Sequence, residues 1–238
     1  MDTISTNQHI SHKFDEEMEN LRHKVLKMGG LVEQQIRAAI EALQNSDVAK
    51  AEKVIRKDHK VNALEVTIDE ACIRILARRQ PAASDLRMVV AVIKTITDLE
   101  RIGDEAGRVA RMAISLAEDD VKFSSRYAGI HHLGDMVSRM MHEVLDAYAR
   151  LDVDAAVKVV RDDDETDKEY QDLIRMLSTY MMEDPRRISE ILDVIWVARS
   201  LERIGDHAKN IGEYIIYLVK GKDVRHLDLA EIEQDILS

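Results

Sequence analysis

The 238-residue sequence contains few residues that break helices or cross-link loops: two prolines, nine glycines, one cysteine and 4% aromatic residues. A single cysteine, Cys72, excludes an internal disulfide and fits a reducing compartment. Its position on an apolar helical face indicates a small core residue rather than a nucleophile. Strand-like runs between turn clusters are absent, whereas apolar side chains recur at helical spacing nearly throughout. The sequence therefore predicts an all-α protein.

Long hydrophobic runs and an excess of positive charge are also absent. No run reaches the roughly 18 apolar residues that suggest a membrane span, and the polar segment Met1–Ser11 has no signal-peptide core. The 45 acidic and 34 basic residues give a net charge of −11, which disfavours nucleic acid and anionic lipid as ligands. We expect a soluble cytoplasmic protein that binds metal cations or basic protein surfaces and meets membranes only through partners.

The hexapeptide Leu-Glu-Arg-Ile-Gly-Asp occurs twice, at Leu99–Asp104 and Leu201–Asp206. Upstream, at a shift of 105 residues, the two halves also share a run of identical positions around Ala51–Asp58 and Ala156–Asp163. Two small gaps bring the hexapeptides into the same register, so the chain after about residue 20 is an internal duplication.

Each copy is expected to form an antiparallel three-helix bundle, because short turns make successive helices neighbours. Apolar periodicity and turn residues predict helices near 14–43, 48–79 and 84–117, then near 125–150, 154–182 and 187–220. Ser46 or Asp47 can cap the second helix. We expect the first repeat within residues 1–120, the second within 121–222 and a loose or short helical tail at 223–238, with the polar stretch 118–125 as the boundary between copies.

Each hexapeptide places a Glu and an Asp four residues apart, at the edge of the apolar stripe of its helix. Arg101, Glu105 and Arg108 fall on the opposite side and are expected to face water. Gly103 and Gly205 cost roughly 1 kcal/mol each relative to alanine. On the packing side, these glycines let a neighbouring helix approach the acids closely.

The preceding helix supplies further acids. Asp58, Asn62, Glu65 and Asp69 form one row in the first copy, and Asp163 and Asp167 lie within an acidic run in the second. Oxygen ligands on two facing helices suit a hard or borderline cation. We predict two sites, made of Asp58, Asn62, Glu100 and Asp104 in the first copy and of Asp163, Asp167, Glu202 and Asp206 in the second.

Repulsion between the acids opposes the predicted sites, and the binding of a cation favours them. Like charges four residues apart cost about 0.2–0.5 kcal/mol per pair, whereas a ligand at 100 times its dissociation constant contributes about 2.7 kcal/mol. Bound metal would more than offset the repulsion. The alternative is that arginines such as Arg56, Arg101 and Arg203 neutralise the acids in surface networks.

The sequence also bears on other functions. A carboxylate-bridged di-iron enzyme needs Glu-x-x-His on two helices, but the motif here is Glu-x-x-x-Asp, and His207 has no histidine at the equivalent position, Glu105. A phosphate-accepting histidine is disfavoured, because none of the five candidates recurs in the other copy. An interaction scaffold is the competing interpretation. Trp196 and the Met181–Met182 pair are expected in the core or in a dimer interface.

The duplicated hexapeptide, the turn Arg79–Arg87 and the segment Met28–Gly30 resemble the PhoU family across nearly the whole chain. That family comprises bacterial accessory regulators of the phosphate-specific transport system. The resemblance implies two three-helix bundles, a homodimer, and E/D-x-x-x-D motifs that bind divalent or iron-type metals, with iron, zinc, manganese and magnesium as candidates. Asn62 stands where the motif has an acid, so the first site should hold metal more weakly.

The resemblance also implies a regulatory role without catalysis. Such proteins restrain phosphate uptake by contacting the ATPase or a membrane component of the phosphate ABC transporter. They also help a phosphate-responsive sensor histidine kinase stay in its signalling-off state when phosphate is ample. The alternative is a purely structural adaptor that needs no metal.

Overall fold

The computed structural model describes residues 3–79, 81, 83–119 and 127–237, and these residues form helices and turns without any strand. The first half contains α1 (Thr3–Asn45), α2 (Val48–Lys57), α3 (His59–Arg79) and α4 (Ala83–Glu118). The second half contains α5 (Ala128–Arg150), α6 (Val153–Glu183), the 3₁₀ turn η2 (Pro185–Arg187) and α7 (Ile188–Lys220), followed by α8 (Leu229–Leu237).

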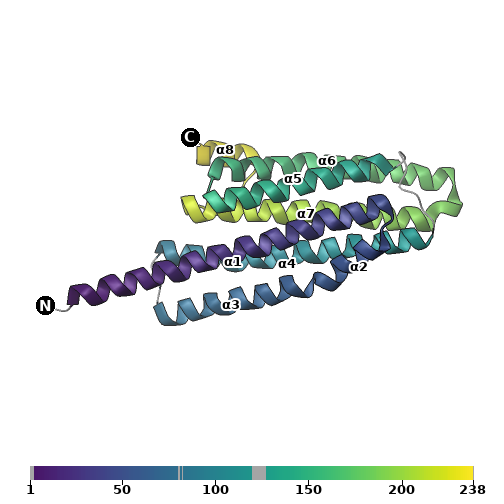
Figure 1. Ribbon diagram of the computed structural model, residues 1–238. Coiled ribbons are helices and arrows are strands. Elements are labelled where there is room, and N and C mark those ends of the chain that lie inside the picture. Colours follow the sequence, from purple (N-terminus) through teal and green to yellow (C-terminus); the bar gives the residue numbers. More distant parts are fainter. Residues whose placement is uncertain (1–2, 80, 82, 120–126, 238) are drawn as a thin grey trace.

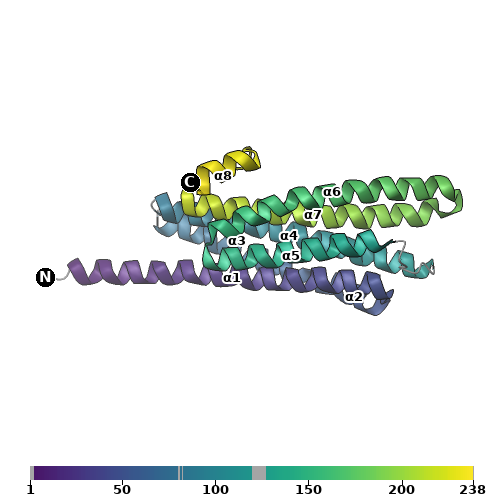
Figure 2. The ribbon, with the colours of Figure 1, turned by 90° about the horizontal axis from the view of Figure 1, so that it is seen from above.

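Each half is a bundle of long antiparallel helices, and the two bundles lie side by side (Figure 1). The start of α1 projects beyond the other helices in both views (Figures 1 and 2), and α8 packs against α6. The prediction of an all-α chain with tandem bundles is confirmed. The expected boundary between the copies falls mostly on residues 120–126, which lie outside the described residues. None of the described helices is both long and apolar enough to cross a lipid bilayer.

The first turn of each copy has the same geometry. Ser46 and Leu151, which correspond in the duplication, both adopt left-handed backbone conformations, with φ of 52° and 53°. The aspartate that follows each of them caps the next helix: Asp47 accepts a hydrogen bond from the backbone of Lys50, and Asp152 accepts one from that of Ala155. Because a side-chain cap satisfies a backbone N–H that the helix leaves free, these aspartates fix where α2 and α6 begin.

The second helix of the first copy differs from its prediction. It is not continuous over 48–79, because Asp58 interrupts it between α2 and α3. The backbone N–H of Asp58 bonds to the carbonyl of Ile55, three residues back, instead of four. A tightened turn of this kind inside a helix is typical of hinges and functional sites. The corresponding helix of the second copy, α6, runs unbroken past Asp163.

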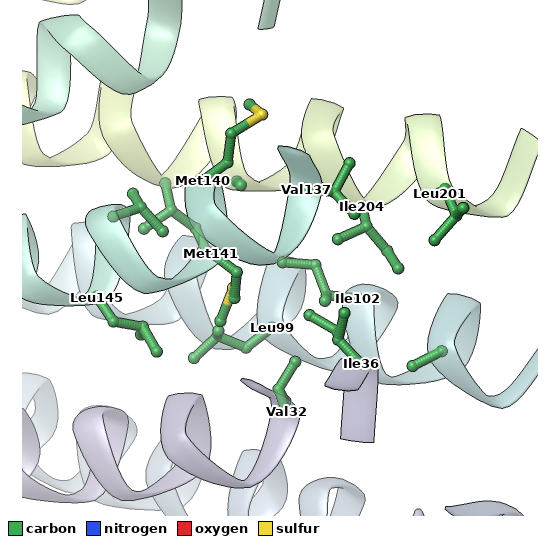
Figure 3. Packing of buried hydrophobic residues seen from close by; sticks show 14 of the residues in the cluster. Val32, Ile36, Leu99, Ile102, Val137, Met140, Met141, Leu145, Leu201 and Ile204 are labelled. Carbon is green, nitrogen blue, oxygen red and sulfur yellow. The ribbon is translucent and has the colours of Figure 1, made fainter. Parts of the chain in front are cut away.

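Four helices form the core between the two bundles. In Figure 3, Val32 and Ile36 of α1 and Ile102 of α4 face Met141 of α5 and Ile204 of α7. These side chains are almost completely buried. Helices α4 and α7 run antiparallel, because Ser115 bonds to Asp193 at one end of their interface while Lys94 lies over the ring of Tyr214 at the other.

The interface between α4 and α7 also buries charged groups. Glu105 was expected to face water, but it is only 3% exposed and pairs with Arg108 and with Arg203 of α7. At the matching position of the other copy, His207 Nδ1 lies 2.7 Å from Asp98 Oδ1. Apolar periodicity predicted an exposed Glu105 because it describes a single helix. It carries no information about a second bundle that covers the same face. Arg101 and Arg108 are exposed, as expected.

Among the predictions for single hydrophobic residues, the structure confirms one and contradicts another. Cys72 is fully buried, which confirms its assignment to the core. Trp196 and Met182 are 62% and 75% exposed, so the expectation that they belong to the core is wrong. They lie where α6 and α7 present apolar side chains to solvent, and the dimer interface remains a prediction for them.

Replacement of Ile102 by alanine tests the interface between the bundles. Because Ile102 is fully buried among four helices, Ile102→Ala should lower the free energy of unfolding by about 2–5 kcal/mol in urea titrations. The matched control is Ile73→Ala on α3, where the side chain is 54% exposed. The control should change stability by less than about 0.5 kcal/mol. Equal losses in both variants would contradict the packing described.

Candidate metal centre

The acids predicted in the second copy converge between α6 and α7. One carboxylate oxygen each from Asp163, Asp167 and Asp206 lies within 4.8 Å of the others. Asp163 and Asp167 stand one turn apart on α6, and Asp206 faces them from α7. Glu202 precedes Asp206 by one turn and is also buried. The structure therefore brings all four predicted residues to one place, with three of them close enough to share an ion.

Gly205 permits this close approach. A β-carbon at this position would lie 3.3 Å from Thr166 Cγ2 and 3.5 Å from Asp163 Oδ1. Gly103 has the same role in the first copy, where a β-carbon would lie 3.4 Å from Asp58 Oδ1. The absence of a side chain thus sets an acid of the second helix of each copy directly against the third.

The second cluster contains buried oxygens that lack hydrogen bonds. Lys209 donates to Asp163 Oδ2 at 2.9 Å, and Arg199 donates to Glu202 Oε1 at 2.7 Å. The other oxygens of these two carboxylates, Asp163 Oδ1 and Glu202 Oε2, are buried and have no partner among the described residues. A buried acceptor without a donor is costly, and a cation between the helices would satisfy both.

The raised pKa values of these acids also favour a cation between the two helices. Burial, reinforced by the charges of Asp167 and Asp206 and opposed by Lys209, raises the pKa of Asp163 to about 6. Burial and Asp206 raise the pKa of Glu202 to about 7. Burial and Asp206 also raise the pKa of Asp167. Each shift reflects a negative charge that is insufficiently solvated or neutralised, and a nearby metal ion would reverse that effect.

The residues present fit a metal ion in number and type. Hard divalent cations bind carboxylate oxygens at about 2.0–2.6 Å, so two oxygens on one ion lie up to about 4–5 Å apart. The 4.8 Å limit of the second cluster meets this condition. The donor set consists of oxygens alone, which suits magnesium, manganese or calcium better than it suits metals that prefer sulfur.

The first copy forms a looser cluster. Asp58 sits at the break between α2 and α3 and accepts a hydrogen bond from Gln35 Nε2 at 3.3 Å. Glu100 is half-buried, while Asp104 and Asn62 are exposed. Burial, followed by the charges of Asp104, Glu65 and Asp58, raises the pKa of Glu100. Among the described residues, no three acids of this copy meet the spacing found in the second.

Two functional candidates were missed by the sequence prediction. Glu65 was noted in the acidic row but left out of the site, yet its pKa is raised by burial, by Asp69 and by Asp104, which places it beside the hexapeptide acids. Its position, three residues after Asn62, could have suggested it as the missing acid. Lys209 has no such signal, because only the fold brings it to Asp163.

The pH dependence of stability tests the burial of these acids in metal-free protein. Because the pKa values of Asp163 (about 6) and Glu202 (about 7) lie above those of an unfolded chain, the folded state binds more protons between about pH 4 and pH 7. Their contribution is therefore destabilising above pH 7 and disappears as the pH falls toward 4. Glu202→Gln removes the carboxylate. Its effect on the free energy of unfolding, compared with the unsubstituted protein, should therefore be more stabilising at pH 8 than at pH 5.5, by on the order of 1 kcal/mol.

Chemical denaturation at the two pH values measures this difference. The exposed residue Glu183, at the end of α6, provides the control. Glu183→Gln should keep the pH dependence of the unsubstituted protein. A Glu202→Gln variant with that same dependence would show that the carboxylate is adequately solvated.

Comparison with known proteins agrees with this architecture. The family model described as the PhoU domain matches twice, at residues 25–113 and 130–215. The chain is 50% identical over 232 residues to the phosphate-specific transport system accessory protein PhoU homolog of Pseudomonas aeruginosa, covering 98% of this chain and 96% of that one. It is 48% identical to the accessory protein PhoU of Escherichia coli K12, covering 98% and 96%.

Solved structures give the same result. The crystal structure of PhoU from Pseudomonas aeruginosa superposes with a TM-score of 0.85 at 52% identity, covering 88% of this chain and all of that chain. The phosphate transport system regulatory protein PhoU from Streptococcus pneumoniae superposes with a TM-score of 0.81 at 30% identity, covering 89% and 99%. The chain belongs to the PhoU family.

Proposed function

We propose that this protein is a regulator of phosphate homeostasis that restrains a phosphate-specific ABC transporter when phosphate is ample. The observation that carries the proposal is similarity over 98% of the chain to relatives named as accessory proteins of that transport system. The protein would contact the ATPase or a membrane component of the transporter from the cytoplasm. It would also help hold a phosphate-responsive sensor histidine kinase in its off state, without catalysing a reaction.

We further propose that metal binds at the acid clusters. In the second copy Asp163, Asp167 and Asp206 would hold the ion, with Glu202 beside them, and the unpartnered oxygens of Asp163 and Glu202 support this assignment. In the first copy Asp58, Glu100 and Asp104 would bind more weakly with Asn62, helped by Glu65. A bound divalent cation supplies the positive charge that the clustered carboxylates lack.

The proposed consequence of metal binding is mechanical. The carboxylates come from two helices, so their repulsion opposes the contact between α6 and α7 when no cation is present. Lys209 offsets part of this charge by its bond to Asp163. Neutralisation would tighten the second bundle and fix the surface that α6 and α7 present to partners.

A homodimer is proposed from the exposed apolar row on α7. Ile188, Leu192 and Trp196 lie four residues apart and are 41%, 44% and 62% exposed, with Met182 of α6 also exposed. Apolar groups aligned on one helical face are typical of helix-to-helix interfaces. Sedimentation of the purified chain as a monomer at micromolar concentration would contradict the proposal.

A competing proposal is a scaffold that regulates without metal. It is favoured by Lys209 and Arg199, which already partner one oxygen of Asp163 and one of Glu202. Under this reading the acids are structural, and their loss would leave regulation intact in any variant that folds.

Genetic complementation tests the proposed function. A bacterial strain that lacks its own family member would receive the chain or its Asp163→Asn/Asp206→Asn variant, in medium rich in phosphate. The unsubstituted chain should lower both radiolabelled phosphate uptake and a reporter of the kinase pathway. Because the variant loses two of the three converging carboxylates, both signals should stay near the level of the deletion strain.

The control variant Asp119→Asn/Asp135→Asn removes two exposed carboxylates outside the cluster and should behave like the unsubstituted chain. Failure of the unsubstituted chain to change either signal would refute the regulatory proposal. Full activity of a folded Asp163→Asn/Asp206→Asn variant would refute the role of metal and favour the scaffold.

A further inference from the structure

A cavity of about 480 Å³ opens between α1 and the segment formed by α2 and α3. Its wall has an apolar part, which includes Leu31, Val54 and Val61, and a basic part made by Lys53, Lys57 and Lys60. Sites that bind small organic molecules usually have volumes of about 300–1,000 Å³ and combine an apolar wall with a few polar groups. The cavity has this composition and lies apart from the carboxylates of the second cluster.

The charge of the cavity is opposite to that of the protein. The chain carries a net charge of −11, yet four lysines and only two acids, Glu41 and Asp47, line this one cavity. Lys50, one of these four lysines, is neutralised by Glu41. By contrast, Lys53, Lys57 and Lys60 form no ion pair with any described residue. Like charges three and four residues apart on a helix repel one another, so the fold alone gives no reason to gather them.

The internal duplication supplies a comparison within the same molecule. A second cavity, of about 310 Å³, lies between α5 and α6. At the shift of 105 residues, every residue that lines it corresponds to a residue that lines the first. The two cavities are therefore copies of one another on the same scaffold.

The copies have diverged in charge. Asp162 and Glu165 replace Lys57 and Lys60, and Glu143 replaces Ala38. Lys158, the counterpart of Lys53, contacts Glu143 at 2.5 Å and Asp162 at 3.6 Å. The second cavity thus neutralises its own lysine, whereas the first leaves all three lysines available to an external anion. Since both bundles fold, the basic lining is not a requirement of the architecture.

Gln35 adds a buried polar group to the wall of the first cavity. It is 6% exposed, donates to Asp58 Oδ1, and its Oε1 has no partner among the described residues. The corresponding residue of the second cavity is Met140, an apolar side chain. The amide of Gln35, like Lys57 and Lys60, is therefore a feature of the first cavity that the second cavity lacks.

We propose that the cavity between α1 and α2 binds a small organic anion. Its apolar body packs against Leu31, Val54 and Val61, and its doubly charged head, of the kind that a phosphate monoester carries, lies among Lys53, Lys57 and Lys60. Lysine binds such groups as a mobile point charge, and three of them match a head with more than one negative charge. The proposal is independent of the regulatory function proposed above.

Isothermal titration of the purified full chain with 1-naphthyl phosphate tests the proposal. We expect saturable binding of one molecule per chain. Inorganic phosphate, which lacks the apolar body, and 1-naphthol, which lacks the charge, should each bind at least about tenfold more weakly, because each engages only half of the lining. Lys57→Asp/Lys60→Glu should also lower the affinity about tenfold or more, since it replaces two attractions with repulsions.

The matched control is Arg139→Asp/Lys158→Glu, which makes the same change of net charge in the second cavity and should leave the affinity within about twofold. Ala38→Glu provides an independent variant, because it gives the first cavity the carboxylate that Glu143 gives the second, and it should also abolish tight binding. Circular dichroism confirms that each variant folds.

Three outcomes would overturn the proposal. The first is the absence of saturable binding of 1-naphthyl phosphate. The second is an equal loss of affinity in the two double variants, which would indicate only a general effect of net charge. The third is binding of inorganic phosphate as tight as that of its naphthyl ester, which would show that the apolar wall contributes nothing.

Discussion

The close approach of α6 and α7 is the contact on which the site depends. With glycine at position 205, Thr166 and the carboxylate of Asp163 can lie directly against α7. This packing brings Asp163 to 1% exposure and sets Asp167 and Asp206 beside it. A carboxylate can be held there only if something supplies the positive charge and the hydrogen bonds that water would otherwise give. Lys209 supplies one such contact, and a cation would bind the other oxygen of Asp163, which accepts no hydrogen bond from any described residue.

Duplication explains why the molecule can carry two versions of each feature. Both copies join their first and second helices through a left-handed residue and an aspartate cap, and both carry the same hexapeptide within their third helix, so their helices are presented in the same way. On this common frame the second copy concentrates acids, with Asp167 where the first has Asn62. The first copy instead breaks its helix at Asp58 and keeps a basic cavity beside the break. A tight acid cluster and an open basic cavity thus occupy different halves of one chain.

Sequence alone predicted the parts that depend on one helix or on the repeat. Apolar periodicity and the Asp47 cap gave the helices, and the hexapeptide with its glycine gave the convergence of Asp163, Asp167 and Asp206. It failed where two bundles meet, because Glu105, Asp98 and His207 are buried by the other repeat rather than by their own helix. It also missed the break at Asp58, where neither proline nor glycine marks the chain, and Lys209, whose partner lies 46 residues away.

Anomalous X-ray diffraction from crystals of the protein soaked in manganese would test the central claim most directly. The account predicts a manganese peak between α6 and α7, about 2.0–2.6 Å from oxygens of Asp163, Asp167 and Asp206. A weaker peak, or none, is predicted beside Asp58. Manganese bound only elsewhere on the protein, with Asp163 still bonded to Lys209 and no peak among the three aspartates, would contradict it.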